Sequence, residues 1–200
     1  MRFSLSIHVS VTNRPAFVLR KTSPVIHLCP LADIDPTAVE HLLDAAFGAD
    51  RRGRTAYRMR EGVDEIAELS FAALDGDVIV GTIQCWPVAL VGDDHDLTPI
   101  TLVGPVAVDP AVQRGGIGRM LMSHMLEAAH VHDVKAMMMI GDPEYYERFF
   151  GFSSVATRHW DIPGPVERHR VLARCDGADY LPAHGRIIPH PAFATEPATA

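Results

Sequence analysis

Cysteine, positive charge and long apolar runs are scarce in this chain, and each scarcity excludes a class of protein. The three cysteines, Cys29, Cys85 and Cys175, are odd in number and far apart, which fits neither a disulfide framework nor a zinc-ligand spacing. We therefore expect the protein to reside in the reducing environment of the cytoplasm. The 18 basic residues are outnumbered by 25 acidic ones, and the formal charge of −7 makes nucleic acid an unfavourable partner. No segment has the character of a bilayer span or of a signal-peptide core, so we expect no membrane association.

Apolar residues, in contrast, are abundant. They make up 48% of the 200 residues, which is enough for one domain with a substantial core. We assign this domain to residues 24–175. Residues 1–23 form an N-terminal extension, whose alternating apolar residues fit either an edge strand or a poorly ordered translated start. Residues 176–200 form a C-terminal extension, and its Pro-, Ala- and Thr-rich tail is expected to be disordered.

Turn and cap signals divide the domain into strands and helices. Asp35-Pro36 predicts the N-cap and first position of a helix that runs to Phe47. Asp75-Gly76, between two apolar runs, predicts a hairpin. Further strands are expected at residues 24–29, 100–108 and 136–140, and helices from residue 117 and from residue 143. The first of these two helices is long and amphipathic, and one face of it is predicted to consist of Ile117, Met120, Leu121, His124 and Ala128.

The most informative segment is a strand, a glycine-rich loop and a helix start at residues 103–118. Helix N-termini bind anions, because the N–H groups of the first turn lack intrahelical partners and the helix dipole adds roughly half a positive charge. Gly115, Gly116 and Gly118 carry no Cβ atoms, so a phosphate can approach the backbone closely. The loop lacks the Lys-Ser/Thr of a Walker A loop and is not the G-x-G-x-x-G of a dinucleotide fold.

The spacing Gln113-x-x-Gly116-x-Gly118 resembles motif A of the GNAT superfamily of acetyl-CoA-dependent N-acetyltransferases. A second segment supports the resemblance: the short apolar strand 136–140 followed by 144–152, with sequence EYYERFFGF, looks like the fifth strand and fourth helix of that family. The resemblance extends over roughly residues 24–152. It implies an α/β (α+β) GNAT fold, with a mixed, mostly antiparallel central sheet flanked by helices and splayed strands at the cofactor site.

The resemblance also implies acetyl-CoA as the acetyl donor, and no metal. The backbone of the fourth strand is expected to contact the pantetheine arm and the thioester, and the loop with the helix start is expected to hold the pyrophosphate. Gly104-Pro105 is compatible with a bulge in that strand, because proline cannot donate to the ladder. The implied cofactor-binding residues are Val106, Ala107, Val108, Gln113, Arg114, Gly115, Gly116, Ile117, Gly118 and Arg119.

In the family, a tyrosine of the fourth helix usually protonates the coenzyme A thiolate. Two candidates stand here, Tyr146 and Tyr145. The related pattern normally reads Y-Y-x-R-F-G-F, whereas Phe149-Phe150-Gly151 adds one residue, so alignment on the tyrosines and alignment on the glycine select different positions. The alternative is that both tyrosines only pack. Asp142 is assigned a capping role.

No general base is evident. The nearest carboxylates and imidazole are Glu68, Asp93, Asp94 and His95. The arginine-rich segment 50–62 is either a solvated charge run or a basic rim of the acceptor site, and Trp86 and Met59 are either acceptor-pocket or ordinary core residues.

The leading hypothesis is an N-acetyltransferase that acts on a primary amine of a small molecule or a protein by direct attack in a ternary complex. The alternatives are a catalytically weak acyl-CoA-binding or regulatory module and a protein that uses the loop for another phosphate ligand. The resemblance is also compatible with a homodimer. The identity of the acceptor amine is not encoded in these motifs.

Overall fold

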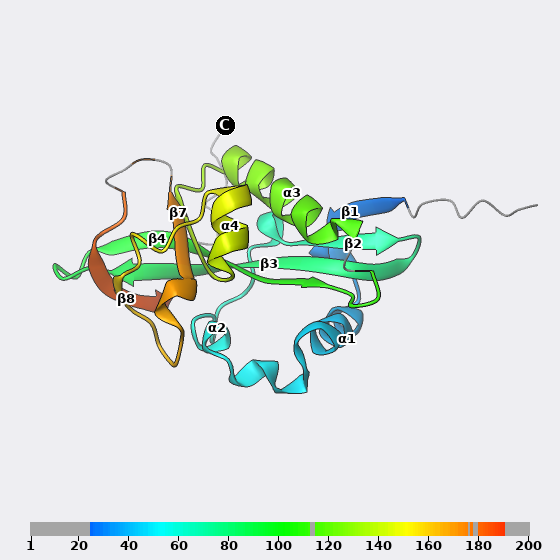
Figure 1. Ribbon diagram of the computed structural model, residues 1–200, viewed down its shortest axis with the longest axis horizontal. Helices are drawn as coiled ribbons and strands as arrows, with labels where there is room; N and C mark the ends of the chain where they lie inside the picture. Colours follow the sequence, from blue (N-terminus) through cyan, green and yellow to red (C-terminus); the bar gives the residue numbers. More distant parts are fainter. Residues whose placement is uncertain (1–24, 113–114, 176, 178–179, 191–200) are drawn as a thin grey trace, which may run out of the picture.

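The computed structural model describes residues 25–112, 115–175, 177 and 180–190 (Figure 1). Its strands are β1 (Ile26–Pro30), β2 (Phe71–Asp75), β3 (Val78–Val91), β4 (Leu97–Val108), β5 (Ala136–Ile140), β6 (His159–Asp161), β7 (Val171–Cys175) and β8 (His184–Pro189). Its α-helices are α1 (Pro36–Phe47), α2 (Thr55–Arg58), α3 (Ile117–Val131) and α4 (Pro143–Phe150). Single 3₁₀ turns span Leu31–Asp33, Ala49–Gly53, Ala67–Leu69 and Arg168–Arg170. None of the helices in the described ranges is long and apolar enough to cross a membrane.

The strands form one open sheet in the order β1-β2-β3-β4-β5-β7. All neighbours along this path are antiparallel except β4 and β5, which run parallel. β8, which lies in the predicted C-terminal extension, pairs with the second half of β3 and carries β6 on its other side. Helices α3 and α4 lie on one face of the sheet, and α1 and α2 lie on the other (Figure 1). The predicted fold class, a mostly antiparallel mixed sheet flanked by helices, is confirmed.

Helix α1 begins and ends where the sequence predicts. The Asp35 carboxylate accepts a hydrogen bond from the N–H of Thr37 at 2.9 Å, and Pro36 occupies the first helical position. Leu42 and Leu43 are buried against Ala107 of β4. This packing holds α1 against the C-terminal end of β4.

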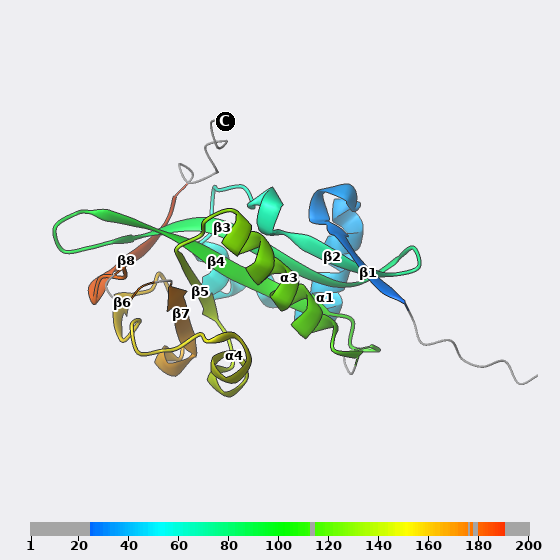
Figure 2. The same cartoon turned by 90° about the horizontal axis from the view of Figure 1, so that it is seen from above.

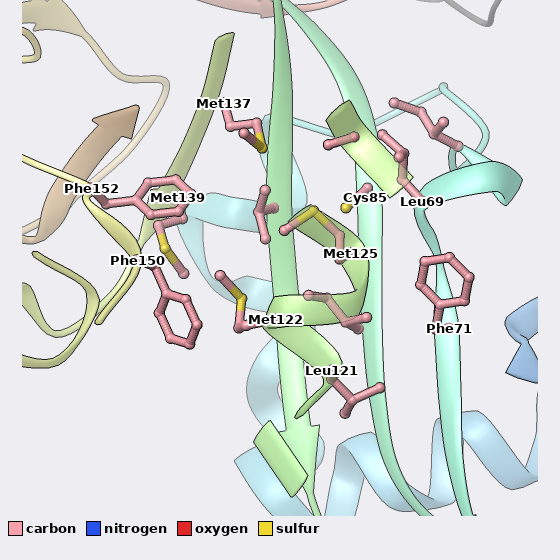
Figure 3. Close-up of a cluster of buried hydrophobic side chains, with 14 of the residues drawn as sticks. Leu69, Phe71, Cys85, Leu121, Met122, Met125, Met137, Met139, Phe150 and Phe152 are labelled. Carbon is pink, nitrogen blue, oxygen red and sulfur yellow. The ribbon is translucent and has the colours of Figure 1, made fainter. Parts of the chain in front are cut away.

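Helix α3 packs on the opposite face through Ile117, Leu121, Met122, Met125 and Ala129. The predicted face was therefore partly wrong, because Met120, His124 and Ala128 are only half-buried. The buried stripe is rotated because α3 contacts two neighbours, the sheet and α4. Seen from above, α3 crosses β3 and β4 while α4 lies beside β5 and β7 (Figure 2). Figure 3 shows the cluster shared by these elements, with Met122, Met139, Phe150 and Phe152 in one part of it.

Candidate active site

The sheet opens between the parallel strands β4 and β5. β4 and β5 pair only at Thr101 with Met137 and at Leu102 with Met138. β4 then continues to Val108 and β5 to Ile140, with no further pairing recorded between these two strands. The β4 edge beyond Leu102 therefore presents backbone N–H and C=O groups that no strand in the described ranges occupies. The predicted splaying of strands is confirmed at this point.

A bulge in β4 lies at the start of the opening. Ile83 of β3 pairs with Val106 and Cys85 pairs with Val103, so a step of two residues on β3 faces a step of three on β4. The extra residue falls at Gly104-Pro105, which confirms the predicted bulge. After it, Val106 and Val108 pack toward the α3 side and Ala107 packs toward α1. The bulge follows directly after the last β4 residues that pair with β5.

The segment after β4 leads the chain to the N-terminus of α3. The Asp109 N–H donates to the carbonyl of Val80 at 2.9 Å, and the Asp109 carboxylate accepts from the N–H of Ala111 at 2.8 Å. Gln113 and Arg114, predicted to bind the pyrophosphate, lie outside the described residues. The described residues resume at Gly115, whose N–H donates to the carbonyl of Val112 at 3.0 Å.

The N-terminus of α3 is open. Gly116 is its N-cap in the left-handed region, with φ 75°, and no side chain in the described part of the chain caps the helix. Among the described residues, a Cβ on Gly116 would meet no atom within 4 Å, and one on Gly118 would meet only Val108 Cγ2, at 3.6 Å. No side chain of this part of the chain therefore covers the first-turn N–H groups of α3 beside the end of β4.

The side chains of two predicted cofactor residues contact other parts of the protein. Ile117 is 2% exposed and fits beneath Gly81, where an added Cβ would lie 2.8 Å from Ile117 Cγ2. Ile117 thus offers the cofactor only its backbone. Arg119 is exposed, and its guanidinium carbon lies 4.1 Å from the ring centroid of Phe149 in α4. This contact links the open helix end to α4.

Tyr146 lies at the C-terminal end of β5. Its ring packs on Gly141, where an added Cβ would be 2.6 Å from both Cδ2 and Cε2. Burial raises the pKa of the Tyr146 phenol to about 12, with smaller contributions from Tyr145 and Asp142 and an opposing one from Arg170. The phenol is therefore protonated throughout the physiological range. Tyr145 stacks edge-on against Tyr146, with ring centroids 5.0 Å apart, and also contacts the rings of the two phenylalanines that follow it in α4.

Helix α4 accommodates the extra residue of the Phe149-Phe150 pair by directing the two rings differently. Phe150 is buried in the core, whereas Phe149 is 42% exposed beside Arg119. Gly151 ends the helix with φ 69°. At the other end, the Asp142 carboxylate accepts from the Glu144 N–H at 3.1 Å, which confirms its predicted capping role. The register of the tyrosines relative to β5 is thus set at the N-terminus of α4.

A carboxylate that the sequence analysis missed lies beside Gln84 of β3. The N–H of Ile66 donates to the Cys85 carbonyl at 2.8 Å, which places the preceding residue, Glu65, next to β3. Gln84 Nε2 donates to Glu65 Oε2 at 3.1 Å. Burial raises the pKa of Glu65, although the Gln84 hydrogen bond and the charge of Arg60 oppose that shift.

The carboxylates and imidazole named from the sequence lie elsewhere. Asp93, Asp94 and His95 occupy the exposed turn between β3 and β4, which is roughly 20 Å or more along β3 from Gln84. Glu68 is exposed in the 3₁₀ turn before β2. The alternation along β3 is the signal that points to Gln84, since Ile83 and Cys85 enter the core of the α3 side and the residue between them faces the other way.

A cavity of about 350 Å³ opens on the α2 side of the sheet. Its lining residues are Glu40, Arg52, Tyr57, Arg60, Glu61, Gln84 and Trp86. Gln84 and Trp86 stand on β3 next to the bulge, and Trp86 pairs with Leu102, the last β4 residue paired with β5. The cavity and the open helix end therefore lie on opposite faces of the sheet, and Trp86 of the cavity pairs with the β4 residue after which β4 and β5 separate.

The arginines of segment 50–62 differ in their environments, so neither a solvated charge run nor a basic rim of the acceptor site describes all of them. Arg51 is 1% exposed and binds the carboxylates of Glu40 and Asp44 and the hydroxyl of Tyr57. Arg60 is 8% exposed and lines the cavity, as does Arg52, whereas Arg54 and Arg58 are exposed outside it. Met59, the other acceptor-pocket candidate, is a fully buried core residue. No group of three metal-binding side chains occurs among the residues that the structure describes.

Comparisons with known proteins agree with this arrangement. The model of the acetyltransferase (GNAT) family matches residues 37–152. A curated Escherichia coli K12 protein, the uncharacterized N-acetyltransferase YhbS, is 28% identical over 150 residues, which cover 72% of this chain and 85% of that protein. The crystal structure of E. coli YhbS in complex with CoA superposes with a TM-score of 0.68 at 22% identity, covering 88% of this chain and 97% of that one.

A second solved structure shares the fold. It is a GNAT family acetyltransferase from Brucella melitensis in complex with acetyl-CoA, with a TM-score of 0.59, 24% identity, and coverage of 86% of this chain and 99% of that one. The family model spans more than half of the sequence and ends at Phe152, just after α4. The chain belongs to the acetyltransferase (GNAT) family.

Proposed function

We propose that this protein is an N-acetyltransferase that transfers the acetyl group of acetyl-CoA to a primary amine within a ternary complex. The observation that carries the proposal is the separation of β4 from β5 directly beside the uncapped N-terminus of α3. Together they form a site for an extended thioester with an anionic end. The relatives support the choice of donor, since E. coli YhbS was crystallised with CoA and the Brucella protein with acetyl-CoA.

The anionic end of the cofactor is assigned to the start of α3. The N–H groups of residues 116–119 would bind the diphosphate, Gly115 would allow its close approach because it carries no Cβ, and the helix dipole would add to the attraction. Arg119 would pair with a phosphate oxygen from its position over Phe149. Gln113 and Arg114 complete the proposed set on the strength of the sequence motif alone.

The pantetheine arm and the thioester are assigned to the open edge of β4. The backbone of Val106, Ala107 and Val108 would bind the arm as a neighbouring strand would. The bulge would leave a backbone N–H for the thioester carbonyl, whose oxygen gains negative charge when the amine attacks. The sheet thus contributes a donor that is already in place before the reaction begins.

Two side chains are assigned to proton transfer. Glu65, in hydrogen-bond contact with Gln84, takes a proton from the ammonium form of the acceptor, directly or through one water molecule. The neutral nitrogen attacks the carbonyl carbon, the C–N bond forms, and the C–S bond breaks. Tyr146 protonates the departing thiolate, and its raised pKa keeps the phenol protonated for that step. The amide nitrogen releases its remaining extra proton to solvent.

Free thiol release from acetyl-CoA across a panel of amines tests the proposal. We expect amine-dependent thiol release and a product whose mass is that of the amine plus an acetyl group. Tight binding of acetyl-CoA without thiol release for any amine would instead favour an acyl-CoA-binding or regulatory module. Failure to bind acetyl-CoA at all would refute the assignment of the site.

A further inference from the structure

The cavity on the α2 side contains a buried cation without a carboxylate partner. Arg60 is 8% exposed, and its guanidinium carbon lies 3.8 Å from the ring centroid of Tyr57 and 4.4 Å from that of Trp86. Within the described ranges, no carboxylate lies within 4.0 Å of it. Stacking between two rings covers the faces of the guanidinium and leaves its edge for hydrogen bonding.

Three buried polar atoms of the same cavity lack hydrogen-bond partners among the described residues. They are Arg60 Nη1, Trp86 Nε1 and Gln84 Oε1. The first two are donors and the third is an acceptor. The orientation of the Gln84 amide follows from chemistry, because its Nε2 donates to the carboxylate of Glu65. Unpartnered buried groups are costly, so this set indicates a ligand that supplies an acceptor and a donor.

A comparison with Arg51 shows that the lack of a partner is specific to Arg60. Arg51 belongs to the same segment and is also buried, yet Glu40 and Asp44 neutralise it. Glu40 also binds Arg52, so its carboxylate forms ion pairs with two arginines. Arg51 therefore stabilises the fold, whereas Arg60 lines the cavity with no carboxylate of the described residues within ion-pair distance.

We infer that the cavity binds the acceptor amine through a second group, a carboxylate, held by Arg60 and the indole N–H of Trp86. This inference rests on the proposed function and adds the substrate class. The amine of the same molecule would donate to Gln84 Oε1, beside Glu65 and the bulge. Both ends of an amino acid-like acceptor are thereby satisfied, with the reacting nitrogen nearest to the thioester.

A carboxylate fits better than a phosphate. Glu40 and Glu61 lie on the wall of the same cavity, so a group with two negative charges would meet about twice the repulsion of a group with one. The pair of parallel donors on a guanidinium edge also matches the two oxygens of a carboxylate. The cavity volume of about 350 Å³ suits a small acceptor.

Paired amines test the inference, for example phenylalanine with phenethylamine and lysine with cadaverine, and phosphoethanolamine as the phosphate-bearing probe. With the wild-type protein, we expect kcat/KM to be at least about 30-fold higher for the carboxylate-bearing member of a pair. Arg60→Met should reduce that ratio to about 3 or less, mainly by raising KM for the carboxylated amine. Arg58→Met removes an exposed arginine outside the cavity and should leave the ratio unchanged.

Trp86→Phe is the second variant, because it keeps an aromatic ring and removes only the N–H donor. We expect Trp86→Phe to lower the ratio of kcat/KM between the carboxylated and the decarboxylated amine about 3- to 10-fold. If Arg60→Met does not fold, Trp86→Phe tests the inference by itself. An undiminished preference in both folded variants would overturn the inference, as would a wild-type preference for decarboxylated amines or for phosphoethanolamine.

Calorimetry separates this inference from the proposed function. Binding of a carboxylated amine to the CoA-loaded protein is measured without turnover. Binding that depends on Arg60, with no acetylation of any amine, would support the carboxylate site and refute the acetyltransferase assignment. Acetylation that is indifferent to the carboxylate would do the reverse.

Discussion

Gly116→Glu is the sharpest test of the proposed cofactor site, because its cost to folding is small. A Cβ at this position meets no atom of the described residues within 4 Å, so the penalty expected from them comes from the positive φ of 75°. That penalty is about 1–2 kcal/mol for a residue with a Cβ. A domain of this size loses roughly 2–4 °C in Tm per kcal/mol, so Tm should fall by about 2–8 °C. The variant should therefore fold.

Its effect on cofactor binding should be much larger. A carboxylate about 4 Å from one phosphate charge costs about 4 kcal/mol at an effective dielectric constant of 20, which is about three decades in affinity. Because the glutamate side chain can turn partly toward solvent, we expect acetyl-CoA affinity to fall at least about a hundredfold. Gly116→Gln carries the bulk without the charge and should lose only about tenfold.

Isothermal calorimetry with acetyl-CoA measures these affinities, and circular dichroism confirms that each variant folds. Gly76→Glu is the matched control, because Gly76 also has a positive φ, of 62°, and open space around its missing Cβ, but lies in the turn between β2 and β3. Wild-type affinity in Gly116→Glu would refute the loop assignment. Equal losses in Gly116→Glu and Gly76→Glu would show that added negative charge, rather than occupation of the loop, weakens binding.

Three further predictions concern the catalytic groups and the core. Tyr146→Phe should lower kcat about a hundredfold at unchanged acetyl-CoA affinity, whereas Tyr145→Phe should keep kcat within about twofold of wild type. Thiol release measures both, and a larger loss in Tyr145→Phe would assign the donor role to Tyr145. In wild type, kcat/KM should rise with pH through the Glu65 pKa, which burial raises above the ordinary value. Glu65→Gln should lose that acidic limb, and an unchanged pH profile would exclude Glu65 as the base. Phe152→Ala removes a ring with 0% exposure and should lower the free energy of unfolding by about 3–5 kcal/mol in urea titrations, unlike Phe149→Ala, which should change it by less than about 1 kcal/mol.

Glu65 also has a predictable effect on stability. Its pKa is raised in the folded state, so the contribution to stability is fully present below the ordinary carboxyl pKa and is lost as pH rises through the raised value. Replacement by glutamine removes the buried charge and keeps a partner for Gln84. We therefore expect Glu65→Gln to have a higher Tm than wild type at pH 7 while being less active, and a lower Tm would contradict the direction of the pKa shift.

The proposed cofactor half of the site could be identified from the sequence because its parts are local. Strand end, loop and helix start follow one another within residues 103–119, and they act through backbone groups whose conformation depends on nearby glycine and proline. The bulge at Gly104-Pro105 and the cap at Asp142 were predicted for the same reason, and both are confirmed. The buried face of α3 was misplaced because its orientation depends on contacts with both the sheet and α4, which helical periodicity alone does not specify.

The residues of the proposed acceptor half of the site could be identified only from the tertiary structure. Glu65 and Gln84 are 19 residues apart, and their contact depends on how the segment before β2 lies along β3. Arg60 and Trp86 meet only because the turn after α2 folds beneath β3. Sequence by itself thus determined the fold family and the phosphate-binding candidate, since those depend on backbone conformation set by neighbouring residues. The register of the sheet and the packing of distant loops decided which side chains share a cavity, because such contacts depend on positions that no local pattern records.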